Sequence, residues 1–160
     1  MRGMAILGLT AMGSAVFWGN ALAADQSVIM ASDPGSIVDI ARGYGSAALS
    51  ADDNGDPLIK GRIDGLAYSI YFYDCENHVK CKSVQLYAGF EVSPKPDFKR
   101  LNEWNQTKRW SKAYANKAGD PGIEYDVSML HGIPRDTLDE VFSLWGGLIK
   151  DFGTFIGYKP

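Results

Sequence analysis

Two cysteines and a histidine lie close together in the sequence, and they are the residues best suited to chemistry. Cys75, His78 and Cys81 follow a C-x2-H-x2-C spacing. Thiolate and imidazole groups at this spacing could supply three of the four ligands of a zinc ion. The two cysteines could instead form a disulfide that closes a short loop, with His78 exposed in that loop. The pattern defines no fourth zinc ligand, so we favour the disulfide. A metal-binding or enzymatic protein centred on the Cys75–Cys81 loop is the alternative.

The other motifs of catalytic or binding proteins are incomplete. Asp52, Asn54 and Asp56 alternate as they do at the start of an EF-hand loop. Pro57 replaces the glycine that such a loop requires and Ile63 replaces its last glutamate, so we expect a plain turn. The chain has two histidines and no G-x-S-x-G nucleophile motif. We therefore expect a non-enzymatic protein with no catalytic residue, bound metal or cofactor.

The N-terminal segment has the layout of a secretory signal peptide. Arg2 precedes an apolar stretch over residues 4–18, which is shorter than the ~20 residues of a membrane span. Ala21-Leu22-Ala23 matches the A-x-A pattern that precedes a cleavage site. We predict three parts of the chain: a signal peptide at 1–23, a short linker at 24–32 and one domain at 33–160.

Export has consequences for the location and chemistry of the domain. We expect it in the periplasm, with a Gram-negative bacterium as the source. It would contact a membrane only through an uncleaved signal segment. An oxidising compartment favours the disulfide between Cys75 and Cys81.

Composition limits the partners of the chain. Its 160 residues are 46% hydrophobic and 22% charged, which suits one domain with a buried core. A net charge of −3 argues against a nucleic-acid binder. Basic residues gather over 95–117. We interpret this segment as a solvated face, with an acidic partner or lipid headgroups as the alternative.

Periodicity predicts an α+β fold. Strict alternation over 66–73 and 83–91 predicts two strands, and Asp64-Gly65 predicts a hairpin turn before the first. The expected order is α-β-β-β-α-β-β-α, an antiparallel sheet covered by helices on one face. The expected elements are a helix from Asp33 to Gly43, strands at 58–63, 66–73 and 83–91, a helix at 98–107, strands at 109–115 and 123–129, and a last helix over about 136–152.

The two central strands carry an unusual second face. If their apolar residues face the helices, the alternate side chains point the other way: Tyr71, Tyr73, Gln85 and Tyr87. Tyrosines in such positions can pair across neighbouring strands. They can also form a contact surface for a second copy of the chain or for an extended peptide. We interpret these four as partner-binding residues, with a protein or peptide partner or a homodimer as the complex.

Several stretches of the chain resemble the YbjN family, over residues 34–155. They are CKSVQLYAGF (81–90), LNEWN (101–105), RWSKAY (109–114) and Gly132-Ile133 before the apolar helix. Members are described as bacterial sensory transduction regulators. The resemblance implies a fold like that of type III secretion chaperones and a chaperone-like, regulatory or protein-interaction role. It supplies no catalytic residues. The signal peptide and the cysteine pair indicate an exported branch of the family.

Overall fold

The computed structural model of the chain describes residues 27–159. The predicted signal peptide lies outside these residues. Part of the predicted linker is packed against the domain, because Val28 and Ile29 pair with Pro134 and Ile133 in a two-stranded sheet. The side chains of Ile29 and Ala31 are buried in the core.

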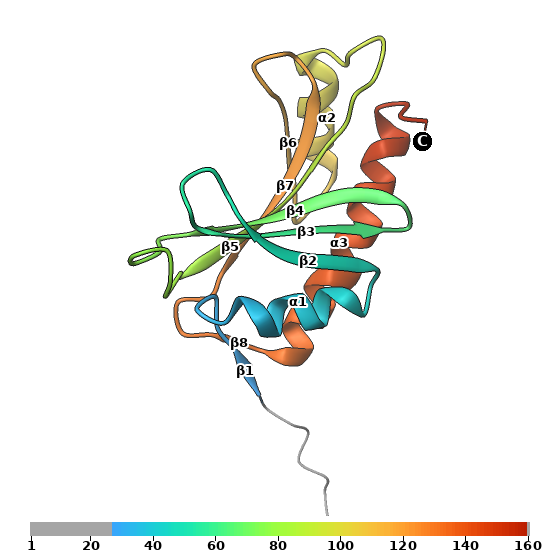
Figure 1. Ribbon diagram of the computed structural model, residues 1–160. Helices are drawn as coiled ribbons and strands as arrows, with labels where there is room; N and C mark the ends of the chain where they lie inside the picture. Colours follow the sequence, from blue (N-terminus) through green and yellow to red (C-terminus); the bar gives the residue numbers. More distant parts are fainter. Residues whose placement is uncertain (1–26, 160) are drawn as a thin grey trace, which may run out of the picture.

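Six strands form one antiparallel sheet in the order β2-β3-β4-β5-β7-β6, and three helices accompany it (Figure 1). The α+β class is therefore confirmed. The elements are β1 (Val28–Ile29), α1 (Pro34–Arg42), β2 (Ser46–Ala51), β3 (Pro57–Ile63), β4 (Leu66–Tyr73), β5 (Ser83–Gly89), α2 (Phe98–Thr107), β6 (Lys112–Ala115), β7 (Pro121–Ser128), β8 (Ile133–Pro134) and α3 (Arg135–Phe155).

The sheet contains one strand that the sequence pattern does not predict. A three-stranded meander is expected before the second helix, but β2 precedes it and makes four. The segment SAALSA has small residues without large apolar side chains in alternation. It becomes a strand because a tight turn at residues 52–56 folds it back onto β3, with Leu49 opposite Ile59.

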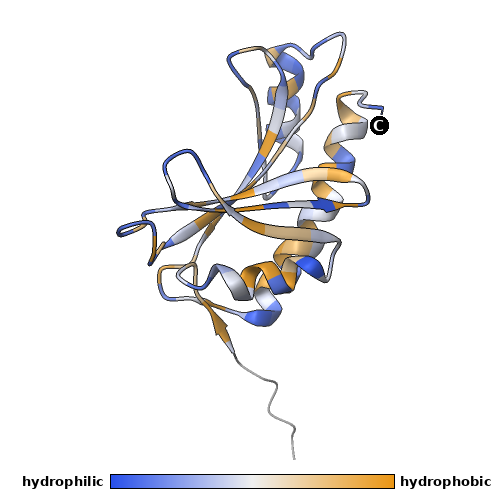
Figure 2. Ribbon diagram, in the orientation of Figure 1, coloured by the Kyte–Doolittle hydropathy of each residue, from blue (hydrophilic) through white to orange (hydrophobic). Residues whose placement is uncertain are grey.

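One face of the sheet is buried under the helices. The inward side chains of Ile70, Phe72 and Leu86 are almost completely buried, as are Trp145 and Phe142 on α3. Figure 1 shows α3 crossing the strands with α1 along its first half, and Figure 2 shows the apolar residues of both helices. Burial of this one face is the hydrophobic driving force of the fold.

The second helix joins the far end of the sheet to the end of α3. Trp104 on α2 is fully buried, and its ring meets that of Phe152 edge-on with the centroids 5.0 Å apart. The indole Nε1 donates to Ser111 Oγ at 3.0 Å. At the start of the helix, Asp97 accepts from the backbone N–H of Arg100 at 2.8 Å, as an N-cap should. None of the helices within residues 27–159 is long and apolar enough to cross a membrane.

Tyr68 on β4 is packed over a glycine of the neighbouring strand. A Cβ atom on Gly61 would overlap the ring of Tyr68, so only glycine fits there. The Tyr68 side chain is 3% exposed, and its hydroxyl has no hydrogen-bond partner among residues 27–159. Burial raises the pKa of Tyr68 to about 12.

We predict that Tyr68→Phe raises the free energy of unfolding at neutral pH by about 1 kcal/mol, because it removes a buried unpaired hydroxyl. The parent should also lose stability as the pH rises from 10 to 12. In that range the unfolded tyrosine ionises and the folded one does not. Urea unfolding at a series of pH values should show a smaller alkaline loss in the variant. A variant less stable than its parent at pH 7 would contradict this account.

Candidate interaction face

The four residues predicted to bind a partner lie together on the uncovered face of the sheet. In the β4–β5 ladder Tyr71 is opposite Gln85, Tyr73 is opposite Ser83, and Tyr87 is opposite Ser69. The residues between them along each strand are buried against the helices. Alternation of side chains therefore turns all four to the opposite face.

A third and a fourth strand extend this face beyond the predicted residues. The strand β7 lies between β5 and β6, with Glu124 between Tyr87 and Lys112 in the register. Tyr114 on β6 points to the same side, and its ring centroid lies 6.4 Å from that of Tyr87. The centroids of Tyr71 and Tyr87 are 6.2 Å apart. We call Tyr71, Tyr73, Tyr87 and Tyr114 the tyrosine cluster.

Two glycines make room for the ring at the centre of the cluster. A Cβ atom on Gly122 would lie 2.9 Å from Cε2 of Tyr87, which is closer than real contacts allow. A Cβ atom on Gly89 would meet the Tyr87 hydroxyl. Tyr87 therefore covers the bare backbone of β5 and β7, which leaves its ring half-buried.

Polar side chains connect the rim of the cluster. The Tyr73 hydroxyl donates to Gln85 Oε1 at 3.3 Å, and Gln85 Nε2 donates to Asp126 Oδ1 at 2.6 Å. Lys112 Nζ lies 2.8 Å from a Glu124 carboxylate oxygen and 3.5 Å from one of Asp126. These contacts cross-link four strands, β4, β5, β7 and β6, and hold the side chains of the rim in defined positions.

Three phenols of the cluster have raised pKa values. Burial raises the pKa of Tyr73, Tyr87 and Tyr114, and the carboxylate of Glu124 raises all three further. At physiological pH their hydroxyls therefore remain hydrogen-bond donors. The cluster, together with Gln85 and Glu124, lines a shallow depression of about 310 Å³. Aromatic faces combined with hydroxyl donors suit contact with another polypeptide.

A second hollow of about 470 Å³ adjoins the cluster over β3 and β4. Its surface includes the small residues Ser46, Ala67 and Ser69, with Lys60 and Arg62 as its basic side chains. The uncovered face therefore has basic side chains on β3 and acidic side chains, Glu124 and Asp126, on β7. Tyr71, Tyr73 and Tyr87 lie between them on β4 and β5, and Tyr114 lies beyond them on β6.

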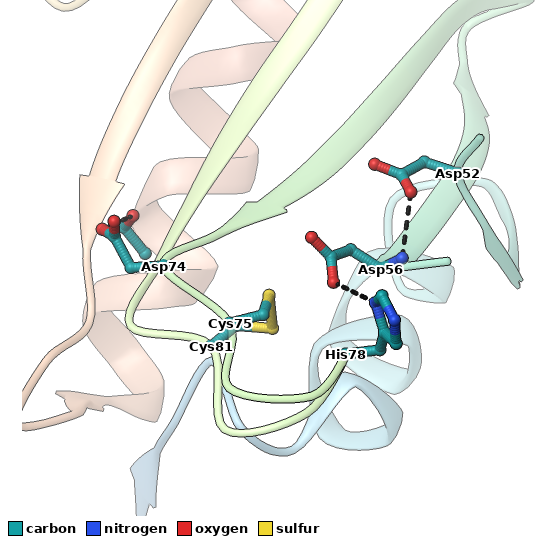
Figure 3. Close-up of a disulfide and its surroundings, with 7 residues drawn as sticks. Asp52, Asp56, Asp74, Cys75, His78 and Cys81 are labelled. Atoms are coloured by element: carbon teal, nitrogen blue, oxygen red, sulfur yellow. Dashed lines mark hydrogen bonds and ion pairs between the residues drawn. A yellow bond between two sulfur atoms is a disulfide. The ribbon is translucent and has the colours of Figure 1, made fainter. Parts of the chain in front are cut away.

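The two cysteines lie at disulfide distance in the loop between β4 and β5. The Sγ atoms of Cys75 and Cys81 are 2.10 Å apart (Figure 3). The bond closes the loop as the sequence predicts, and it occupies both sulfurs that a zinc site would need. Within residues 27–159, no group of three or more His, Cys, Asp and Glu side chains is arranged to hold a metal ion.

The loop histidine connects two neighbouring turns. His78 Nδ1 lies 2.9 Å from Asp56 Oδ1, in the turn between β2 and β3 (Figure 3). Asp52 Oδ1 accepts from the backbone N–H groups of Asn54 and Asp56, both at 2.9 Å. These contacts are those of a plain turn, as predicted. His78 thus braces the two hairpin loops, although its side chain is 60% exposed.

The predicted basic segment is a solvated surface with many ion pairs. Lys95 pairs with Asp120, Arg100 with Glu103 and Lys108 with Asp151, at 2.6, 2.8 and 2.9 Å. Lys112 faces the two carboxylates described above. Pairing neutralises much of the positive charge that an acidic partner or lipid headgroup would need, which supports the interpretation as a solvated face.

Tyr114 is the member of the site that sequence reasoning missed. The strand that carries it is predicted, but its place in the sheet is not, because β7 inserts between β5 and β6. Gly89 and Gly122 are the available signals, since glycines within strands often mark positions where another group lies against the backbone.

We predict that replacing both cysteines, in Cys75→Ala/Cys81→Ala, lowers the free energy of unfolding by about 2 kcal/mol, from the entropy of closing a short loop. Denaturant unfolding would measure the loss. His78→Ala is the matched control in the same loop, and it should cost less because the side chain is exposed. Equal losses in the two variants would show that the disulfide contributes nothing beyond the loop contacts.

The family comparison agrees with this architecture. Residues 37–157 match the YbjN family, described as "Putative bacterial sensory transduction regulator". No curated protein matches the chain. The matched region runs from within α1 to just beyond α3 and so contains the whole six-stranded sheet. The chain belongs to the YbjN family.

Proposed function

We propose that this chain is a non-enzymatic, periplasmic regulatory domain that binds a protein partner through the tyrosine cluster. The family supports a regulatory or interaction role. The observation that carries the proposal is the composition of the uncovered face. A one-sided sheet normally exposes polar side chains, whereas this one exposes four adjacent tyrosines.

The chemistry of the cluster supports a polypeptide as its ligand. Tyrosine is enriched at protein interfaces, since its ring contributes a large apolar area and its hydroxyl a hydrogen bond. The rim offers both donors and acceptors through Gln85, Lys112 and Glu124. Cross-strand pairing of tyrosines would by itself stabilise the sheet. A partner additionally uses the part of each ring that the sheet leaves accessible.

The proposed location in the periplasm has two supports. Residues 1–23 have the layout of a signal peptide. The disulfide between Cys75 and Cys81 is a bond that persists in oxidising compartments and is rare in the cytosol. The occupied sulfurs also argue against the metal-binding or enzymatic alternative centred on their loop.

The proposal predicts that Tyr71→Ser/Tyr87→Ser loses partner capture without unfolding, because both rings lie outside the buried core. A photo-crosslinking amino acid at Gln85 should join the parent to one reproducible protein in periplasmic extracts, and the double variant should lose at least about tenfold of that product. Circular dichroism would verify the fold.

The matched control removes exposed apolar side chains elsewhere. Phe98→Ser/Val28→Ser alters two residues that are 81% and 55% exposed. Phe98 begins α2 and Val28 belongs to the separate two-stranded sheet, so neither lines the tyrosine depression. This control should retain the crosslinked product. Equal crosslinking by the Tyr71/Tyr87 variant would overturn the assignment of the partner to this face.

Export predicts two properties of the protein recovered from the periplasm. Its mass should correspond to a chain that begins at residue 24 or 25, and it should contain no free thiol. Intact mass measurement before and after alkylation checks both. A full-length chain with two reactive thiols and one bound zinc would refute export and restore the metal-binding alternative.

A further inference from the structure

The two edges of the six-stranded sheet differ in how their backbone groups are used. At the β6 edge, the Asn105 side chain of α2 fills the place of a neighbouring strand. Its Oδ1 accepts from the Ala113 N–H at 2.7 Å and its Nδ2 donates to the Ala113 carbonyl at 3.1 Å. This edge is therefore blocked.

The β2 edge is open, and the hydrogen-bond pattern shows which groups point away from the sheet. Asp52 N–H donates to Asp56 O at 2.9 Å, which makes this a hydrogen-bonded pair of the hairpin. Hydrogen-bonded and free pairs alternate along an antiparallel ladder. Ala51, Leu49 and Ala47 consequently direct their backbone groups outward.

Two further observations agree with that assignment. Ala51 is opposite Pro57, which has no N–H to donate. The Ala47 carbonyl accepts from Arg42 Nε at 3.2 Å, so it points away from β3. A carbonyl oxygen has two lone pairs and can accept a second hydrogen bond.

Apart from Arg42 at the Ala47 carbonyl, the β2 strand lacks the features that usually protect an edge. The segment SAALSA carries no charge and no proline, and residues 48–51 are exposed. Natural sheets usually protect such an edge with lysine, proline, a bulge or a covering segment. Leu49 adds an apolar side chain that is 50% exposed on the helix side of the sheet, the side of its partner Ile59.

We propose that β2 pairs with β2 of a second copy of this chain, antiparallel about a two-fold axis at Leu49. In this register Leu49 faces Leu49 of the partner subunit, and Ala47 faces Ala51 of the partner subunit. The outward backbone groups of both strands then satisfy one another. No like charges meet, and the two exposed leucine side chains cover each other.

A second copy fits this edge better than a flexible peptide. Ordering a free peptide costs about 1–2 kcal/mol of backbone entropy for each residue. β2 is already held extended by β3, so two copies avoid that cost. The result is a continuous sheet with six strands from each copy. An axis perpendicular to the sheet keeps both tyrosine clusters on the same side, so the dimer presents two binding faces.

The β2 edge lies two strands away from Tyr71 and Tyr73 on β4, and the pairing inferred there does not rest on the proposed function. The test is sedimentation equilibrium of the chain expressed with its own N-terminal segment. The parent should sediment as a dimer. Leu49→Lys places two like charges opposite each other and should weaken dimerisation at least about tenfold.

The matched control is Leu130→Lys, because Leu130 has the same 50% exposure and lies outside the sheet. It should remain dimeric. Tyr71→Ser/Tyr87→Ser should also remain dimeric, which separates this inference from the tyrosine face. A monomeric parent, or a dimer that only the tyrosine substitutions dissociate, would overturn the proposal.

A second measurement tests the register. Opposite residues of a hydrogen-bonded pair have Cα atoms about 5.5 Å apart, within the range that a disulfide spans. Leu49→Cys should therefore form an intermolecular disulfide under mild oxidation. Ala48→Cys should form it at least about tenfold more slowly, since diagonal neighbours lie about 7–8 Å apart. Equal crosslinking by the two variants would contradict the two-fold axis at Leu49.

Discussion

Every second side chain of β4 and β5 is buried against the helices, and this one-sided burial governs the rest of the structure. Ile70, Phe72 and Leu86 each contribute about 1.5–3 kcal/mol by leaving water. A slip of one residue in the register would expose them and force Tyr71 and Tyr87 into the core. The uncovered tyrosine face is therefore a geometric consequence of the hydrophobic core, and a partner that uses it requires no change in the fold.

The position of β7 completes that face. Because β7 lies between β5 and β6, residues far apart in the sequence become neighbours, and Tyr114 comes to lie beside Tyr87. Glycines at 89 and 122 let the central ring rest on bare backbone. Lys112 and Glu124 form their ion pair in the same row. The site is thus a product of strand order as much as of residue type.

The ends and edges of the sheet are stabilised in different ways. Where the hairpin loops meet, a disulfide and the contact of His78 with Asp56 restrain the chain. At β6, Asn105 completes the backbone hydrogen bonding. At β2 the outward backbone groups lack a strand partner within residues 27–159. The open edge and the aromatic face are therefore two separate surfaces of the domain.

Elements with strong local signals can be predicted from the amino-acid sequence alone. Alternation placed β4 at its observed bounds, and the helix expected at 98–107 coincides with α2, because both patterns depend on near neighbours. The pairing of Cys75 with Cys81 followed from spacing and from the signal peptide pattern. The strand at SAALSA depends on tertiary contacts, since its small side chains carry little intrinsic preference and its pairing with β3 supplies the hydrogen bonds. The position of Tyr114 in the cluster and the open edge at β2 also depend on the tertiary structure. Strand order and edge protection arise from contacts between distant segments, and local periodicity does not encode those contacts.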